Sequence, residues 1–337
     1  MTAAQTETRA GPRTRRLAPR DLDAVVAIDA AITGRSRRAY FERRLRAAMA
    51  EPALHVQHAV DCGGELCGYA LGRKLLGEFG RQEPALRLEV MGVKPGLQGQ
   101  GIGSLALAAL EADARAAGVR QLRTQASWRD HAMLEFFDHA GFELGGNLVI
   151  DCPVHAGALG AEAPVAAREH RHFTSEIDYS DGASNDFEAL ARDVVDVRSL
   201  RREELPDIVR IDRRLTGADR SAYLGEAVAE ALEDSAVRVS LTARVDGIVA
   251  GYAMARTDFG DFGRSEPVAV LDTIGVDPDY AHRHVGTALL SQLFVNLEAL
   301  HVERVETVVA RHDFALLGFL YKAGFGPAQR LGFVKRL

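Results

Sequence analysis

The sequence repeats itself at a fixed interval of 183 residues, and this interval limits the folds that the chain can adopt. No gap is needed to align the two copies from about residue 28 to residue 142. Among the matching segments are Ile28-Asp29 and Ile211-Asp212, Gly68-Tyr69-Ala70 and Gly251-Tyr252-Ala253, and Ala140-Gly141-Phe142 and Ala323-Gly324-Phe325. A repeat of this length indicates two copies of one domain. Each difference between the copies therefore compares two versions of one site.

The interval also sets the domain boundaries. A chain of 337 residues is expected to hold about two domains. We predict a flexible tail at residues 1–13, a first domain at 14–150, a linker at 151–195 and a second domain at 196–337. The linker is rich in Ala, Gly, His, Asp and Ser and has little periodicity. Each domain is long enough to bury a core of its own.

Composition excludes several classes of protein. A net charge of −6 argues against a nucleic acid partner, which needs a basic surface, and suits a cationic acceptor such as an amine. No apolar run approaches the roughly 20 residues of a membrane span. Cys62, Cys67 and Cys152 make no paired framework and no metal-ligand cluster, so we expect a cytoplasmic protein without a metal. Nothing in the sequence indicates an oligomeric state.

The hydrophobic pattern of each copy alternates helices with strands. In the first copy we expect helices near residues 21–33, 40–50, 102–117 and 131–139, and strands near 55–59, 66–71, 86–93, 121–125 and 144–150. Gly118 is placed to end the third of these helices. The second copy repeats the order. Helices that alternate with strands in this way indicate an α/β or α+β sheet domain.

A glycine-rich loop carries the clearest chemical signal. It follows an apolar strand, opens a helix and reads Val93-Lys94-Pro95-Gly96-Leu97-Gln98-Gly99-Gln100-Gly101-Ile102-Gly103. Unpaired backbone N–H groups and the positive end of the helix dipole suit a phosphate, and a Cβ at a glycine would keep an anion away. The third glycine of a dinucleotide fingerprint and the Gly-Lys-Ser/Thr of a P-loop are both absent. A flexible helix start without a ligand remains the alternative.

Gln98-x-x-Gly101-x-Gly103 after Val93-x-Pro95, with Gly141-Phe142 about forty residues later, resembles the acetyl-CoA-binding core of the GNAT superfamily of N-acetyltransferases. The resemblance covers nearly all of each copy. It implies two tandem GNAT-like domains, each with a mixed, mostly antiparallel, splayed sheet flanked by helices. It also implies that acetyl-CoA, the co-substrate, contacts Met91, Gly92, Val93, Gln98, Gly99, Gln100, Gly101, Ile102, Gly103 and Ser104.

The second copy departs from this pattern. Ala281 replaces Gln98 and His284 replaces Gly101, so side chains crowd the expected phosphate position. We therefore expect acetyl-CoA in the first domain and a degenerate loop in the second. The alternative is a phosphate site rescued by the charges of His282, Arg283 and His284.

The resemblance also implies catalytic residues. Glu89 is similar to the family's frequent glutamate base, and the backbone near Met91 and Val93 would stabilise the oxyanion. A solvated strand carboxylate or an ion pair is the alternative for Glu89. The family's usual tyrosine acid is absent, since Phe137 occupies its position.

In the second copy that tyrosine position is occupied by Leu320. Tyr321 is one residue away and would point about 100° aside on a helix. His131 or water would then serve as the acid.

The acceptor side is less defined. Tyr40, Arg81 and Glu83 lie where the family places acceptor-binding loops, and we expect them to bind substrate. Pairs such as Asp29 with Arg37 could instead only pin loops.

We predict an acetyl-CoA-dependent N-acetyltransferase whose acceptor is a small-molecule or protein amine, without nucleic acid or membrane partners. A non-catalytic acyl-CoA-binding regulator and an acyltransferase for longer acyl groups are the alternatives.

Overall fold

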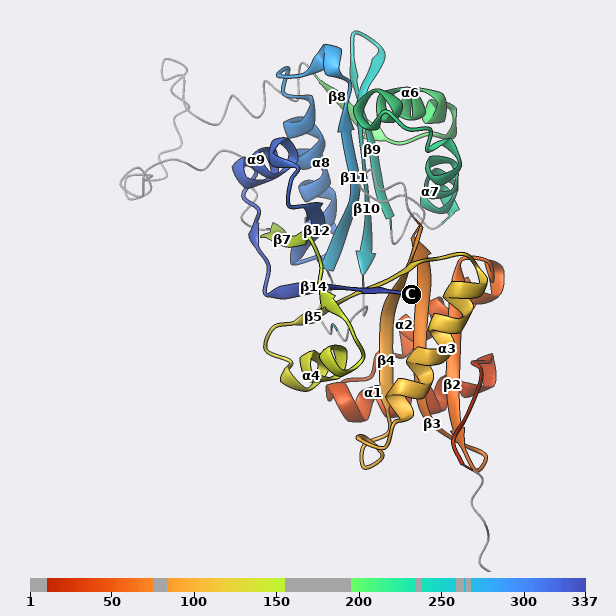
Figure 1. The fold of residues 1–337 in the computed structure, drawn as a ribbon. Helices are drawn as coiled ribbons and strands as arrows, with labels where there is room; N and C mark the ends of the chain where they lie inside the picture. Colours follow the sequence, from red (N-terminus) through yellow and green to blue (C-terminus); the bar gives the residue numbers. More distant parts are fainter. Residues whose placement is uncertain (1–10, 76–83, 155–194, 234–237, 259–263, 265–267) are drawn as a thin grey trace, which may run out of the picture.

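The computed structural model describes residues 11–75, 84–154, 195–233, 238–258, 264 and 268–337. Two mixed sheets of seven strands, each flanked by helices, make up the molecule (Figure 1). The predicted fold class, two tandem α/β domains, is confirmed. Arg81, Glu83 and most of the predicted linker lie outside the described residues.

The described elements of the two repeats follow the same order. The first repeat contains β1 (Arg13–Arg16), η1 (Pro19–Asp21), α1 (Leu22–Thr33), α2 (Arg38–Ala50), β2 (His55–Cys62), β3 (Glu65–Leu75), β4 (Ala85–Val93), α3 (Ile102–Ala116), β5 (Gln121–Ser127), α4 (His131–His139), β6 (Glu143–Leu144) and β7 (Asn147–Pro153). The second contains β8 (Asp196–Ser199), η5 (Arg202–Glu204), α6 (Leu205–Thr216), α7 (Ser221–Glu233), β9 (Arg238–Val245), β10 (Ile248–Asp258), β11 (Val268–Val276), η7 (Pro278–Tyr280), α8 (Val285–Ala299), β12 (Arg304–Ala310), α9 (Phe314–Lys322), β13 (Gly326–Pro327) and β14 (Arg330–Arg336).

The two repeats exchange their last long strands. The first sheet has the order β1-β2-β3-β4-β5-β14-β6, and the second has the order β13-β7-β12-β11-β10-β9-β8. Strand β14 thus pairs antiparallel with β5 of the first repeat, and β7 pairs antiparallel with β12 of the second. In Figure 1 the yellow-green β7 lies among the strands of the second repeat, and the blue β14 runs to β5.

Glycines stand where the exchanged strands pass each other. The N–H of Gly145 donates to the carbonyl of Gly332 at 2.8 Å. A Cβ on Gly145 would lie 3.3 Å from that oxygen, which is tighter than an ordinary contact. The close approach of the two backbones therefore favours glycine at this crossing.

The exchange changes the meaning of the predicted domains. We expected a last strand at residues 144–150 to complete the first domain. The structure instead forms β7 three residues later and places it in the other sheet. The ranges 14–150 and 196–337 therefore describe the repeats in the sequence, whereas each folded sheet takes a strand from both.

Helices cover both faces of each sheet. In the first repeat, α3 packs on one face over a core that includes Leu86, Leu107 and Leu122. Helices α1 and α2 pack on the other face over a core that includes Phe41 and Tyr69. The second repeat has the matching pair of cores.

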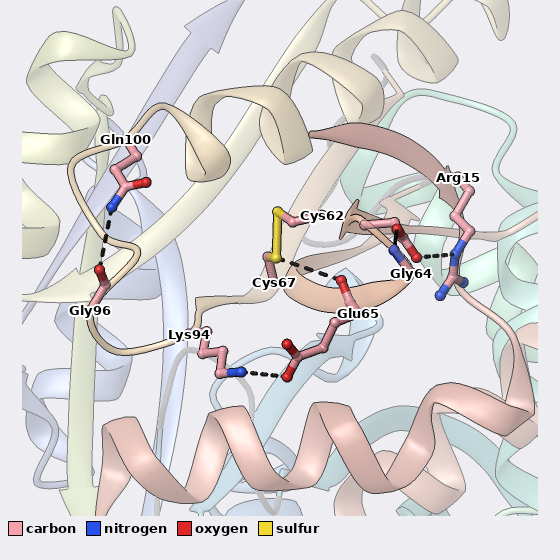
Figure 2. The surroundings of a disulfide bond; sticks show 9 residues. Arg15, Cys62, Gly64, Glu65, Cys67, Lys94, Gly96 and Gln100 are labelled. Carbon is pink, nitrogen blue, oxygen red and sulfur yellow. Dashed lines mark hydrogen bonds and ion pairs between the residues drawn. A yellow bond between two sulfur atoms is a disulfide. The ribbon is translucent and has the colours of Figure 1, made fainter. Parts of the chain in front are cut away.

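The cysteines differ from the prediction. Cys62 and Cys67 form a disulfide across the β2–β3 hairpin, next to the segment that leads from β4 to α3 (Figure 2). Cys152 is a buried free thiol. The prediction that the cysteines make no pair was therefore wrong, because the tight turn at Gly63 and Gly64 brings Cys62 and Cys67 together. No described helix is long and apolar enough to cross a membrane.

Candidate active site

The first sheet opens between its two central parallel strands. Strands β4 and β5 pair only at Leu86 with Leu122 and at Arg87 with Arg123. Beyond this point the side chain of Thr124 donates its hydroxyl to the carbonyl of Leu88 at 3.0 Å. The second sheet repeats the arrangement with Thr307 and the carbonyl of Leu271 at 2.9 Å. The strands therefore diverge at one fixed point in each repeat, and we call this opening the splay.

The glycine-rich loop connects β4 to α3 at the open end of the splay. Gly96, Gly99 and Gly101 have φ values of 84°, 74° and 78°, a region that side-chain-bearing residues rarely adopt. Gly101 is the residue that caps α3, and no side chain caps this helix start. A Cβ on Gly99 or Gly101 would meet no atom within 4 Å. The first N–H groups of α3 lack partners within the helix.

The predicted contact residues divide into exposed and buried groups. Gln98, Gly99, Gln100, Gly101 and Ser104 are exposed, and the Gln100 amide donates to the carbonyl of Gly96 at 3.3 Å (Figure 2). Ile102 is 3% exposed and its side chain belongs to the core. Only its backbone can therefore face a ligand.

Two predicted contact glycines have packing roles. A Cβ on Gly92 would lie 2.7 Å from the Tyr69 ring, and one on Gly103 would lie 3.2 Å from the ring of Phe136. Their presence in both copies is thus explained by close packing. Gly275 and Gly286 meet Tyr252 and Phe319 in the same way.

A cavity of about 320 Å³ occupies the splay. We call it the splay cavity. Its lining comes from α1, the start of α2, β4, β5, α4 and the exchanged strand: Asp29, Ile32, Thr33, Arg37, Leu88, Glu89, Val90, Met91, Thr124, Gln125, Ala126, Ser127, Asp130, Met133, Phe137 and Arg330. Arg330 therefore reaches the first repeat's cavity from the second repeat.

Glu89 lies in this cavity and forms ion pairs with Arg44 and Arg87, an arrangement that we call the Glu89 clamp. Its side chain is 3% exposed, and its carboxylate accepts from Arg44 Nε at 2.5 Å and from Arg87 Nη2 at 2.9 Å. Burial alone raises the pKa of Glu89, but the positive charges of Arg44 and Arg87 outweigh burial and hold this pKa well below its usual range. The contacts match the ion-pair alternative. The role of Glu89 as a base stays a prediction.

His55 lies close to the same cluster. It is 7% exposed, and burial followed by the positive charge of Arg44 lowers its pKa to about 3. His55 is therefore a neutral imidazole at ordinary pH.

Asp29 and Arg37 hold the connection between α1 and α2. Arg37 Nε donates to Asp29 Oδ2 at 2.8 Å, its Nη2 bonds to Oδ1, and the hydroxyl of Tyr69 donates to Oδ1 at 3.0 Å. Tyr40 is buried in the same core, with the Arg37 guanidinium 5.4 Å from the centre of its ring. The Asp29–Arg37 pair therefore fixes the backbone that forms one wall of the splay cavity.

The expected general-acid position is part of the core. Phe137 is 2% exposed and packs against Phe142 and against Phe333 of the exchanged strand. His131 is exposed at the start of α4, and Tyr321 is 74% exposed. Phe137 lines the splay cavity but has no hydroxyl to donate a proton, and neither His131 nor Tyr321 is among the lining residues.

The second repeat keeps two left-handed positions of the loop without the glycines found there in the first repeat. His282 and His284 have φ values of 63° and 60°, close to those of Gly99 and Gly101. A larger cavity of about 930 Å³ is lined by this loop and by Asp212 and Arg220, among others. The left-handed backbone is thus retained at these two positions, each of which carries an imidazole, whereas Asp279, the counterpart of Gly96, lies in η7.

Several site residues were missed by the sequence-based prediction. Thr124 and Thr307 recur at the repeat interval, and this recurrence could have identified them. Arg44 and Arg87 have Ala227 and Val270 as counterparts in the second repeat. Only the first repeat therefore has both arginines of the Glu89 clamp. Arg330 could not have been found, because only the strand exchange brings it to the cavity.

Comparisons with known proteins agree with this geometry. The family model described as acetyltransferase (GNAT) family matches residues 23–142 and 201–325. A search of curated proteins found no match.

Solved structures share the fold at low identity. A tandem GNAT protein from the clavulanic acid biosynthesis pathway is 16% identical with a TM-score of 0.63, and the match covers 96% of this chain and 98% of that one. A GCN5-related N-acetyltransferase from Sphaerobacter thermophilus is 14% identical with a TM-score of 0.57, covering 96% and 95%.

A third solved structure with this fold is that of a fungal multi-domain GH3 β-N-acetylglucosaminidase, which has a GCN5-related glucosamine N-acetyltransferase region. It is 16% identical with a TM-score of 0.63, and the match covers 96% of this chain but 38% of that one. The chain thus spans well under half of that protein. Identities this low show a shared fold.

Proposed function

Because the chain belongs to the acetyltransferase (GNAT) family, we propose that it transfers an acetyl group from acetyl-CoA to a primary amine, with acetyl-CoA held by the first repeat. The observation that carries the proposal is the loop at the open end of the splay. There Gly99 and Gly101 are left-handed, and a Cβ on either would project into open space.

The loop fits the diphosphate of acetyl-CoA. The N–H groups of Gly101, Ile102 and Gly103 at the start of α3 would donate to phosphate oxygens, and the helix dipole favours their negative charge. The exposed amides of Gln98 and Gln100 would add donors. Among the described residues, no group of three or more His, Cys, Asp or Glu could hold a metal ion.

The acceptor amine must lose a proton before it attacks. An alkylammonium with a pKa near 10.4 costs roughly 4–5 kcal/mol to deprotonate at pH 7. The bound co-substrate supplies an activated thioester carbonyl. The edge of β4 from Glu89 to Val93 has no described strand partner on its β5 side, so N–H groups near Met91 and Val93 are available to an oxyanion.

Glu89 would be the carboxylate nearest to this reaction. As a base it would accept the amine proton with a pKa held well below its usual range, which weakens the driving force for proton transfer. As an ion pair it would fix Arg44 and Arg87 beside the splay. The contacts favour the second role.

Calorimetric titration with acetyl-CoA tests the proposal. We compare the native protein with Gly101→Trp and with the matched His284→Trp, which alters the same loop position in the second repeat. A Cβ at Gly101 meets no atom within 4 Å, so the tryptophan blocks the loop at a backbone cost of roughly 1–2 kcal/mol. We expect one site per chain, lost only in Gly101→Trp. Loss only in His284→Trp would move the site to the second repeat.

Release of CoA with a panel of amines tests turnover. Binding without release for any amine would favour the regulator, and tighter binding of longer acyl-CoAs would favour the longer-chain acyltransferase. Small-molecule amines and peptides with free lysines are both included, because the acceptor class is open.

A further inference from the structure

The Cys62–Cys67 disulfide belongs to the first repeat alone. At the repeat interval its counterparts in the second repeat are Val245 and Ala250. There β9 and β10 form the same antiparallel hairpin, and the N–H of Asp277 donates to the carbonyl of Ala250 at 2.8 Å. This hairpin therefore folds without a disulfide. The cross-link is an addition found in the repeat that also keeps the glycine-rich loop.

The end of the cross-linked hairpin contacts both ends of the glycine-rich loop. The N–H of Lys94, which follows β4, donates to the carbonyl of Cys67 at 2.8 Å. The ammonium of Lys94 also forms an ion pair with Glu65 (Figure 2). At the other end, a Cβ on Gly68 would lie 2.8 Å from the side chain of Ile102, the residue that begins α3. The residues next to the disulfide thus hold the first and last parts of the loop.

The sulfur atoms lie in the packed core next to this loop. Cys67 is 2% exposed and belongs to the same core as Ile102, and Cys62 and Leu97 pack against that core. Two thiols need more room than a bonded pair, because non-bonded atoms stand about 3.5–4.0 Å apart. Close packing leaves little spare volume, so the neighbouring side chains have to move. Reduction should therefore shift Ile102 and Leu97, which both belong to the loop segment.

Exchange with a dithiol can open this disulfide. Cys62 is half-buried whereas Cys67 is buried, so the attacking thiolate reaches Cys62 Sγ. A bond forms between the dithiol and Cys62 as the Cys62–Cys67 bond breaks, and Cys67 leaves as a thiolate that takes up a proton. The second thiol of the reagent then displaces Cys62, and the reagent leaves as a cyclic disulfide. Two electrons and two protons pass to the cysteines, and the Cys67 S–H can donate to the Glu65 carbonyl, which lies 3.5 Å from Cys67 Sγ.

We propose that the Cys62–Cys67 disulfide is a site of thiol–disulfide exchange: a dithiol reductant opens it, loosens the glycine-rich loop and thereby lowers the affinity for acetyl-CoA. The effect on affinity rests on the proposed function, because it concerns the same loop. A loop that a cross-link holds in its binding conformation binds more tightly, since less ordering remains to be done on binding. The disulfide form is thus the high-affinity state, and the dithiol form is the low-affinity state.

Calorimetric titration with acetyl-CoA tests the proposal on the two redox states of the native chain. One sample is kept oxidised. The other is treated with dithiothreitol, which is removed under argon before the titration because a free thiol attacks the thioester. Alkylation of an unfolded aliquot should count one free thiol in the first sample and three in the second. We expect acetyl-CoA to bind at least about fivefold more weakly to the reduced protein, and reoxidation to restore the affinity.

The second repeat supplies the matched control. Cys62→Val together with Cys67→Ala gives the first hairpin the residues that the second repeat has at these positions, and this double variant keeps Cys152. Its affinity for acetyl-CoA should not change after treatment with dithiothreitol. Cys62→Val alone retains the buried side chain of Cys67 and should be equally insensitive, so lost packing at residue 67 does not decide the test.

Hydrogen exchange read by mass spectrometry follows the loop without a ligand. Amides of residues 94–107, the loop and the first turn of α3, should exchange faster in the reduced protein than in the oxidised protein. The matching residues 277–290 of the second repeat should not change. If neither redox state binds acetyl-CoA, the proposed function is wrong, while faster exchange at residues 94–107 still establishes that reduction loosens the loop. The two failures are therefore distinguishable.

Four results would overturn the proposal. The first is equal affinity of the two redox states for acetyl-CoA when both bind it. The second is equal exchange of residues 94–107 in the two states. The third is an equal response to dithiothreitol in the double variant, which would assign the effect to Cys152. The fourth is three alkylated thiols in protein that has been treated with an oxidant, which would mean that Cys62 and Cys67 do not bond.

Discussion

Arg44 on α2 and Glu89 on β4 meet as a buried ion pair, with Arg44 Nε donating to Glu89 Oε2 at 2.5 Å. Arg44 also donates to the carbonyl of Gly72 at 2.8 Å, so one guanidinium joins α2, β3 and β4. The pair therefore fastens the helix layer to the strand that borders the splay.

Glu89→Gln should destabilise the protein by about 3–5 kcal/mol at pH 7, because the buried Arg44 would lose the carboxylate that balances its charge. The pKa of Glu89 is depressed on folding, so its stabilisation is fully present above the usual value of 4.5 and is lost as pH falls. Chemical denaturation at several pH values should show the gap to the native protein closing below pH 4.5. Glu65→Gln, at a carboxylate that is 70% exposed, is the control.

The same variant separates the two roles of Glu89. A carboxylate with so low a pKa is ionised throughout the accessible pH range and cannot produce an ascending limb near neutral pH. We expect the profile of kcat/KM against pH to keep its shape in Glu89→Gln. A limb present in the native enzyme and absent in the variant would restore Glu89 as the base.

His55 should make the protein sensitive to acid. Its pKa of about 3 lies below the usual 6.5, so the unfolded state takes up a proton first and stability falls as pH falls below 6.5. This one group should cost about 2 kcal/mol between pH 7 and pH 5. His55→Gln should lose less stability over that interval, whereas His312→Gln, at an exposed position, should match the native protein. Equal losses in all three would exclude His55 as the cause.

Phe333 should matter to the first repeat although it belongs to the second. Its ring centre lies 5.2 Å from that of Phe137 in the core beneath α3. Phe333→Ala should destabilise the protein by about 2–3 kcal/mol, since the ring is only partly buried. Phe314→Ala removes a ring that is 79% exposed and should change stability by less than about 0.5 kcal/mol. Similar losses in both variants would contradict the exchange of β14.

Mass spectrometry after alkylation can test the disulfide by counting the free thiols. The chain has three cysteines. With Cys62 bonded to Cys67, unfolded protein should take up one iodoacetamide without reductant, at Cys152, and three after reduction. Three additions without reductant would mean that Cys62 and Cys67 are thiols.

Most helices and strands could be predicted from local patterns in the sequence. The helix predicted at residues 131–139 matches α4, and Asp130 caps it by accepting from the N–H of Met133 at 3.1 Å. The strand predicted at residues 86–93 matches β4 within one residue. Hydrophobic periodicity, helix caps and turn residues each depend on residues close together in the sequence, so they can be recognised in each repeat separately.

Relations between distant residues were not predictable in the same way. The sequence of β7 has the same alternating pattern whether the strand pairs with β5 of its own repeat or with β12 of the other. No local feature therefore predicts that the two repeats exchange strands. Arg44 and Glu89 are 45 residues apart, and many other arginines could have paired with Glu89. The cysteine count argued against pairing, but the two-glycine turn decided the outcome.

The exchange of strands has a consequence for how the protein is made. The first sheet gains its sixth strand from β14, which leaves the ribosome after every other described element. The contact between Lys335 and Glu111 spans 224 residues. The N-terminal half, although synthesised first, thus keeps an open edge beside β5 until synthesis has passed residue 336. During synthesis, domains usually fold one at a time, beginning with the N-terminal domain. In this protein the first sheet can be completed only after the C-terminal strand β14 has been synthesised.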